Sequence, residues 1–163
     1  MLFSFAYQDA ERTRGISADK NVIDEVQDMD ISFLPVIHET ISASRDWGLI
    51  QYAGTPKTLD NTIEQLWQDS SMAEWMIKCA TCAHWNIRWV HRIKDRRWTS
   101  AGYHVPQIIM PMHYADPEKW EILVGKKQGR GNTPVNVFMN EVCGESYDSG
   151  SKLVTVTDLR RAA

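Results

Sequence analysis

Two adjacent carboxylates follow a short apolar segment near the start of this sequence. Residues 20–24 read KNVID, and Glu25 comes directly after Asp24. Where a strand ends the chain can turn, so that one carboxylate holds Mg²⁺ and the other orients and deprotonates an attacking water. Asp24 is therefore a candidate metal ligand and Glu25 a candidate catalytic residue. The alternative is a solvated strand end, because an apolar residue followed by Asp-Glu is common by chance.

A turn of small residues with a hydroxyl follows a second apolar segment. Residues 47–53 read WGLIQYA, and Gly54, Thr55 and Pro56 come next. Glycine and proline prevent a simple continuation of a strand. In triphosphatases that move along nucleic acid, the next parallel strand often ends in such a turn, which can sense the γ-phosphate. Gly54 and Thr55 are therefore candidate coupling residues.

The cysteines suggest a metal or thiol motif rather than a disulfide framework, because their number is odd. Cys79 and Cys82 could supply two thiolates to a tetrahedral Zn²⁺, with His84 and His91 as possible further ligands. The spacing matches no standard zinc finger, so the alternative is a knuckle of reduced thiols with ordinary surface histidines. Cys143 is interpreted as a buried small apolar side chain.

A basic and aromatic stretch follows the cysteine pair. Residues 85–98 read WNIRWVHRIKDRRW, a mixture that can contact phosphates and stack on bases. The alternative is an amphipathic strand with a solvated basic face. The candidate nucleic-acid contacts are Arg88, Arg92, Arg96 and Arg97.

The composition is that of a globular chain. Of 163 residues, 43% are hydrophobic and 24% charged, which excludes a disordered or collagen-like protein. The uncharged stretch 105–115 is far shorter than the ~20 residues of a membrane-spanning helix, so no membrane partner is expected. The first residues have no features of a secretion signal, which favours a cytoplasmic location. The net charge of −3 argues against a chain that coats nucleic acid over its whole surface.

The elements that must position these residues follow an α/β order. Strands are predicted at 2–7, 20–24, 47–53 and 74–78, with helices after the second and third strands. Asp30 or Ser32 can cap the first helix, and Thr58 or Asp60 the second. This order implies a largely parallel sheet, with buried strands and ligand groups beyond their carboxyl ends.

The second half of the chain has a looser pattern. Possible strands lie at 88–91 and 103–105, and two clearer helices at 117–127 and 134–142. Four large side chains are assigned to core packing: Met110, Met112, Trp120 and Met139.

Five segments in succession resemble a known family. They read VIDEVQDMD, QYAGTPKTLDNTIEQLW, CATCAHWN, AGYHVPQIIMP and NEVCGESYD, and together they look like the large terminase subunit of tailed bacteriophages, which packages viral DNA into capsids. The resemblance covers residues 3–158. It implies that Asp24 and Glu25 belong to the magnesium-binding and catalytic motif, and residues 53–56 to the coupling motif. It also implies ATP and Mg²⁺ as cofactors, and double-stranded DNA, the small terminase subunit and the capsid portal as partners in a bacterial host cell.

The sequence departs from the family in two ways. The phosphate-binding loop Gly-x-x-x-x-Gly-Lys-Ser/Thr is absent, and Gly125-Lys126-Lys127 is no substitute because it falls at a helix end without the following hydroxyl. A second cysteine pair, which relatives often carry, is also absent. Little or no ATP hydrolysis is expected from this chain alone, and whether it is itself an enzyme stays open.

The expected architecture follows from the resemblance and the first departure. We expect a partial sheet of the P-loop NTPase type with flanking helices, without the strand and helix of the phosphate-binding loop. Residues 1–144 would form the C-terminal part of the ATPase domain, with a cysteine knuckle and basic insertion at 78–100. Residues 145–163 would be a linker and the start of a nuclease domain. Two alternatives remain, a non-catalytic nucleic-acid-binding module with a cysteine knuckle and a fragment of a superfamily-2-type helicase.

Overall fold

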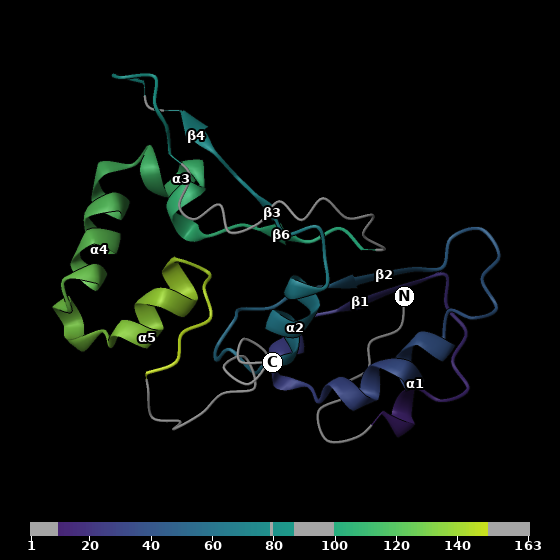
Figure 1. The fold of residues 1–163 in the computed structure, drawn as a ribbon. Helices are drawn as coiled ribbons and strands as arrows, with labels where there is room; N and C mark the ends of the chain where they lie inside the picture. The colour runs from purple at the N-terminus through teal and green to yellow at the C-terminus, as the bar shows by residue number, and fades with distance from the viewer. Residues whose placement is uncertain (1–9, 79, 87–99, 150–163) are drawn as a thin grey trace, which may run out of the picture. The chain divides into compact units, whose positions relative to one another are not determined.

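The structure is a computed structural model that describes residues 10–78, 80–86 and 100–149 (Figure 1). It is a mixed α/β fold with helices and small sheets, two of which are parallel. The chain divides into two compact units. The first unit contains the described residues up to Thr55 together with Asn61–Ile63, and the second contains Pro56–Asp60 and the described residues from Glu64 onward.

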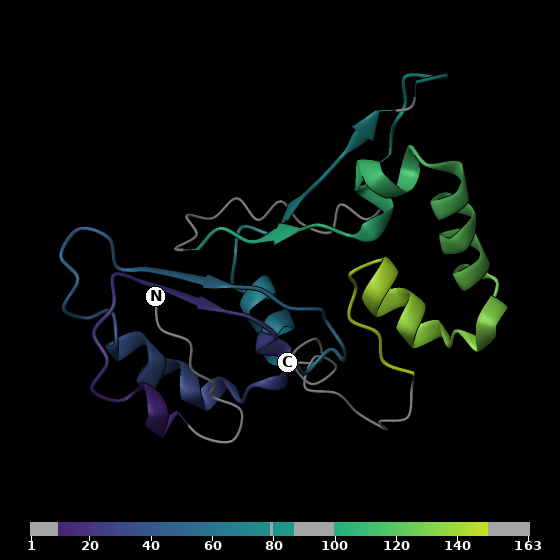
Figure 2. The same ribbon diagram turned by 180° about the vertical axis from the view of Figure 1, so that it is seen from behind.

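The first unit is built around two parallel strands that lie side by side in Figures 1 and 2. The register pairs Lys20 with Leu49 and Ile23 with Tyr52. The elements, with 3-10 helices labelled η, are η1 (Glu11–Thr13), β1 (Lys20–Ile23), η2 (Val26–Asp28), η3 (Ile31–Phe33), α1 (Leu34–Glu39) and β2 (Leu49–Tyr52).

The helical segment between the strands begins as predicted. The Asp30 side chain accepts a hydrogen bond from the Ser32 amide at 2.8 Å, so Asp30 is the cap. Leu34 and Ile37 are buried on one side of the following helix α1. On β1, Asn21 donates to Thr40 Oγ1 at 2.6 Å and to the Ile37 carbonyl at 3.3 Å, which ties this strand to the end of α1.

The prediction of buried strands was wrong for β1 and β2. Both strands alternate between exposed and half-buried residues, and Val22 and Leu49 keep 63% and 47% of their surface exposed. The helix contact explains the alternation, because successive side chains of a strand point to opposite faces and Asn21 faces α1. The sheet is therefore half-buried, like a strand pair with one covered face.

In the described residues of the second unit the strands form two separate pairs. β3 (Ala73–Glu74) pairs in parallel with β6 (Tyr103–His104), and β4 (Ile77–Lys78) pairs antiparallel with β5 (Trp85–Asn86). The strand predicted at 74–78 is thus divided between two sheets, with Trp75 and Met76 exposed between them. Among the described residues every sheet has two strands, and two of the three pairs are parallel, which agrees with the predicted α/β class and parallel pairing at this coarser level.

The other elements described in the second unit are helices. α4 has the predicted bounds because Asp116 caps it, accepting hydrogen bonds from the amides of Glu118 and Lys119 at 3.0 and 3.2 Å. The helix predicted at 134–142 is a short α-helix that continues as a π-helix. The elements are α2 (Thr62–Gln68), whose first two residues belong to the first unit, η4 (Gln107–Ile109), α3 (Pro111–Tyr114), α4 (Pro117–Lys127), η5 (Arg130–Asn132), α5 (Val135–Val137) and the π-helix η6 (Phe138–Val142).

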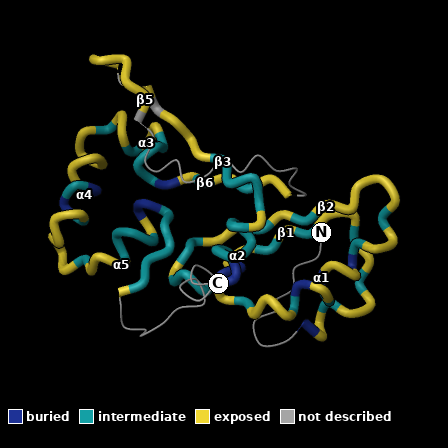
Figure 3. Tube along the Cα trace, in the orientation of Figure 1, coloured by how far each residue is buried: buried dark blue, intermediate teal, exposed yellow. Residues whose placement is uncertain are grey.

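The buried side chains of the second unit differ partly from the predicted core. Leu123, Val142 and Cys143 are buried, which confirms the interpretation of Cys143. Figure 3 shows short buried stretches among mostly exposed and half-buried parts of the chain. Met112 and Trp120 are exposed by 61% and 42%, so their assignment to the core was wrong. Met112 lies on α3 and Trp120 on α4, both at exposed positions, while Met110 and Met139 are half-buried.

Several predictions fall outside the described residues. These are the strands at 2–7 and 88–91, Cys79, His91, Arg88, Arg92, Arg96, Arg97 and the segment 150–163. Within the described part of the chain, no helix is both long and apolar enough to cross a bilayer.

Candidate active site

The two candidate motifs meet at one edge of the β1–β2 pair. Parallel strands end at the same edge, so β1 delivers Asp24 and Glu25 beside the turn that follows β2. Backbone hydrogen bonds extend the contact beyond the strands, since the Ala53 amide donates to the Ile23 carbonyl at 2.8 Å and the Val26 amide donates to the Ala53 carbonyl at 3.1 Å. The acidic pair and the Gly54-Thr55 turn therefore lie together beyond the carboxyl ends of two parallel strands, where the α/β order predicts ligand groups.

The acidic pair lies on a sharp change of chain direction. Glu25 adopts the left-handed conformation, with φ 54° and ψ 36°, before the 3-10 helix η2. A residue with a Cβ pays on the order of 1 kcal/mol or more for this conformation. The Asp24 carboxylate accepts a hydrogen bond from the Glu25 amide at 3.0 Å, which stabilises the turn. Both carboxylates are exposed at the strand end.

A buried glutamine joins the acidic pair to the Gly54-Thr55 turn. Gln27 is only 7% exposed. Its Nε2 donates a hydrogen bond to the Glu25 carboxylate, and its Oε1 accepts one from the Thr55 amide at 3.1 Å. Gln27 was not predicted as a functional residue, because one polar side chain in QDMD carries no periodic or motif signal.

Gly54 leaves room for the close approach of Gln27. A Cβ on Gly54 would lie 2.1 Å from Oε1 and 3.3 Å from Cδ of the Gln27 side chain. The backbone of Gly54 is not left-handed, so the requirement is one of space. The glycine of the coupling turn therefore makes room for the carboxamide beside the Thr55 amide.

A second contact fixes the segment that follows the acidic pair. The buried Thr62 hydroxyl at the start of α2 donates to the Met29 carbonyl at 2.5 Å, directly after η2. The short helix that carries Gln27 is thus held at both ends.

The donors present suit a magnesium ion better than a transition metal. Asp24 and Glu25 offer carboxylate oxygens, and one Asp24 oxygen is already engaged by the Glu25 amide. Magnesium keeps several waters and needs only one or two protein carboxylates when phosphates supply further oxygens. No group of three or more metal-binding side chains occurs within the described ranges, and this pair meets the smaller requirement.

The predicted zinc and nucleic-acid residues are only partly described. Cys82 and His84 are exposed, and the remaining candidate ligands and arginines lie outside the described residues, so the zinc site stays a prediction. On the β4–β5 hairpin, Lys78 Nζ lies 5.7 Å from the centroid of the Trp85 ring, a cation–π contact.

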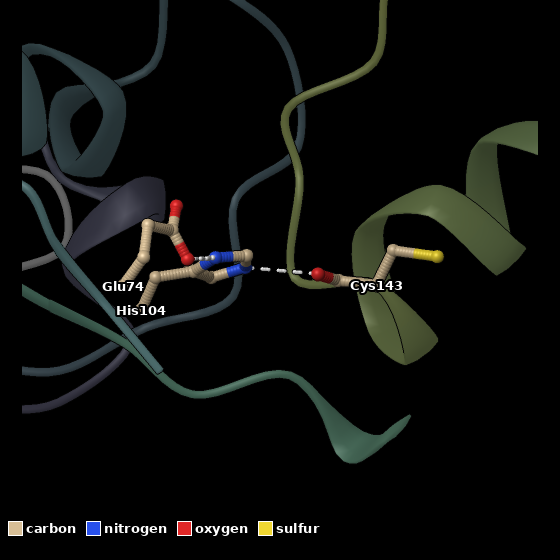
Figure 4. A network of polar contacts seen from close by, with 3 residues as sticks. All are labelled: Glu74, His104 and Cys143. Carbon is tan, nitrogen blue, oxygen red and sulfur yellow. Dashed lines mark hydrogen bonds and ion pairs between the residues drawn. The ribbon is translucent and has the colours of Figure 1, made fainter. Parts of the chain in front are cut away.

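A second polar cluster, in the other unit, was not predicted. His104 on β6 lies between two acceptors (Figure 4): Nδ1 is 2.7 Å from Glu74 Oε2, and Nε2 is 2.9 Å from the Cys143 carbonyl oxygen. Burial alone lowers the pKa of His104, but the hydrogen bond and charge of Glu74, the Cys143 carbonyl and the charge of Glu145 together raise that pKa above its usual value. The cluster joins the β3–β6 pair to the end of η6.

No protein-family model matches this sequence, and neither a curated protein nor a solved structure matches it. The residues and their geometry define the chain as a mixed α/β protein with a carboxylate pair and a glycine turn at one edge of a parallel strand pair.

Proposed function

We propose that this chain is part of an ATP-driven DNA-packaging motor similar to the large terminase subunit, with Asp24 and Glu25 as its metal-binding and catalytic carboxylates. One observation carries the proposal. The acidic pair and the Gly54-Thr55 turn follow two adjacent parallel strands at the same edge and are joined through Gln27. Ligands of open α/β sheets bind beyond the carboxyl ends of their strands.

Each residue has a role in the proposed reaction. Asp24 would hold Mg²⁺, which when bound neutralises negative charge on the nucleotide phosphates. Glu25 would orient the attacking water and accept its proton. Thr55 lies on the turn that would respond to loss of the γ-phosphate.

The proposed fold is a partial sheet of the P-loop NTPase type, and one functional part is missing from the sequence. The sequence contains no glycine-rich loop followed by lysine and a hydroxyl residue. Backbone amides and the lysine of that loop normally hold the β- and γ-phosphates. A segment that this sequence does not contain would have to supply them, and in an experiment it can be added as a separate polypeptide.

This proposal predicts that hydrolysis depends on a second polypeptide. The purified chain should show no Mg²⁺-dependent ATPase activity, and adding a polypeptide that carries the phosphate-binding loop should produce it. Asp24→Asn or Glu25→Gln should then reduce turnover by about 100-fold or more, because metal binding or water activation is lost. Phosphate release measures each rate.

Two exposed carboxylates of the same unit serve as matched controls. Asp46→Asn and Glu39→Gln remove equal charge away from the strand ends and should leave the restored turnover unchanged. Robust hydrolysis by the chain alone, or full activity of Glu25→Gln in the mixture, would contradict the proposed function.

A non-catalytic nucleic-acid-binding module is the second candidate. The observation that favours it is the exposed aromatic surface around β4 and β5, where Trp75 and Trp85 are 61% and 49% exposed and Lys78 lies over the Trp85 ring. Exposed aromatic rings beside cations can stack on bases and contact phosphates. In this alternative Asp24 and Glu25 only shape the turn.

A further inference from the structure

We infer that Gln27 is a positioning residue that transmits the state of the Thr55 turn to the carboxylate of Glu25. The effect of this link on catalysis rests on the function proposed above. The contact itself is a property of the chain, so it can be tested without nucleotide.

The orientation of the Gln27 carboxamide follows from its two partners. The Thr55 amide can only donate, and the Glu25 carboxylate can only accept while it is ionised. Oε1 must therefore face Thr55 and Nε2 must face Glu25, as the structure has them. A flipped carboxamide would place Nε2 against the Thr55 amide, which is also a donor, and Oε1 against the Glu25 carboxylate, which is also an acceptor. The observed orientation is therefore strongly preferred.

Burial leaves the carboxamide few other partners. Gln27 is 7% exposed, and its Oε1 fills the space that a Cβ on Gly54 would occupy. A buried polar group that loses a hydrogen bond without gaining water is destabilised. If the Thr55 amide withdraws, the planar carboxamide has to rotate to find a new donor, and this rotation also moves Nε2 away from Glu25.

Two states of Glu25 follow from this link. With the Thr55 turn in place, Gln27 holds one oxygen of the Glu25 carboxylate and limits its direction. With the turn displaced, Glu25 is released from that constraint. A movement of the Gly54-Thr55 turn would thereby change the orientation of the Glu25 carboxylate, which is the proposed base.

The test measures the Thr55 amide by nuclear magnetic resonance in the chain alone. Glu25→Ala should shift the Thr55 amide resonance in the original chain, because Gln27 loses its acceptor. In a Gln27→Met background, which keeps the length of the side chain without the carboxamide, the same change should have no effect. Gln27→Met should itself accelerate hydrogen exchange at Thr55 on the order of tenfold, because that amide loses its acceptor.

Glu39→Ala is the matched control, since it removes an exposed carboxylate from α1 of the same unit and should leave Thr55 unchanged. An unchanged Thr55 resonance in Glu25→Ala, or an equal response in the Gln27→Met background, would overturn the inference.

A second variant keeps the test decisive if Gln27→Met does not fold. Gly54→Ala should displace the carboxamide while leaving Gln27 in the chain, and should also abolish the response of Thr55 to Glu25→Ala. A Thr55 response that persists in Gly54→Ala would count against the inference.

The two proposals fail separately. Suppose that the Thr55 amide resonance responds to Glu25→Ala only when Gln27 is present, but no polypeptide with the phosphate-binding loop produces hydrolysis. The proposed motor function is then wrong, and the contact through Gln27 is still supported. If hydrolysis is restored without the response, the link is wrong.

Discussion

Gln27 and Gly54 form a pair in which each constrains the other. The Gln27 carboxamide occupies the position of a side chain at Gly54, and the absence of that side chain lets the carboxamide reach the Thr55 amide. The glycine would otherwise be interpreted as a strand breaker, because glycine is common in turns. Here its role is to permit a side chain to approach closely.

This pair predicts a non-additive effect on stability. Gly54→Ala should lower the free energy of unfolding by about 1–3 kcal/mol, because the added methyl group collides with the buried carboxamide. In a Gln27→Ala background the same change should cost much less, because the colliding atoms are gone. Denaturant unfolding of the two single variants and the double variant measures the coupling. Gly48→Ala is the control, since its added Cβ meets neighbours no closer than 3.6 Å, and equal costs of Gly54→Ala in both backgrounds would contradict the explanation.

Short elements in this chain are held by side chains at their ends. β1 is tied to the end of α1 through Asn21, and α4 begins at the Asp116 cap. The β3–β6 pair is short, and His104 links it to the end of η6. Gly144, in the left-handed conformation with φ +64°, follows the accepting carbonyl, and a Cβ there would lie 2.8 Å from His104 Nε2.

The His104 link predicts a stability that depends on pH. Only the protonated ring donates to both Glu74 and the Cys143 carbonyl, so protonation strengthens the link. The groups that face His104 are the carboxylates of Glu74 and Glu145, the Cys143 carbonyl and the Trp67 ring. Because the pKa of His104 is raised in the folded chain, its stabilising contribution is fully present below the unfolded pKa and is lost as pH rises through the folded pKa.

The measurement is the free energy of unfolding between about pH 5 and pH 9. The original chain should lose stability across the folded pKa of His104, and His104→Gln should remove that part of the pH dependence. His113→Gln on α3 is the control and should leave the profile as it is. An unchanged profile in His104→Gln would show that the cluster does not contribute.

The molecule as a whole keeps its two groups of candidate functional residues in different units. The carboxylate pair and the coupling turn belong to the first unit, and the β4–β5 hairpin with Trp85 belongs to the second. The proposed chemistry and the proposed DNA contact can therefore be tested by separate substitutions.

This separation predicts how DNA binding responds to changes in each group. Duplex DNA binding, measured by fluorescence anisotropy at several salt concentrations, should survive Asp24→Asn and Glu25→Gln. The double change Arg96→Ala and Arg97→Ala should weaken binding and reduce the salt slope by about 2, since each phosphate contact contributes about 0.9. The control is the double change Lys126→Ala and Lys127→Ala, which removes two positive charges from the last turn of α4. An equal loss in both double variants would mean that net charge, rather than the basic segment, causes binding.

Local signals predicted the elements whose ends are marked by strong capping or turn residues. The helix Pro117–Lys127 has its predicted bounds because the Asp116 cap and Pro117 at the first helical position mark its start. β1 was predicted from an apolar run before the acidic pair, and β2 from a run before Gly54. Burial was predicted less well, as Val22 and Trp120 show, because exposure depends on what packs against each face.

The sequence alone determined which residues could do chemistry, where β1, β2 and α4 lie, and that Asp24, Glu25, Gly54 and Thr55 follow strands of an α/β order. Only the tertiary structure decided that Gln27 lies between Glu25 and Thr55, and that His104 lies between Glu74 and Cys143. The partners of these two side chains are up to 28 and 39 residues away along the chain. Such contacts depend on strand register and on the packing of distant segments, which local residue preferences do not encode.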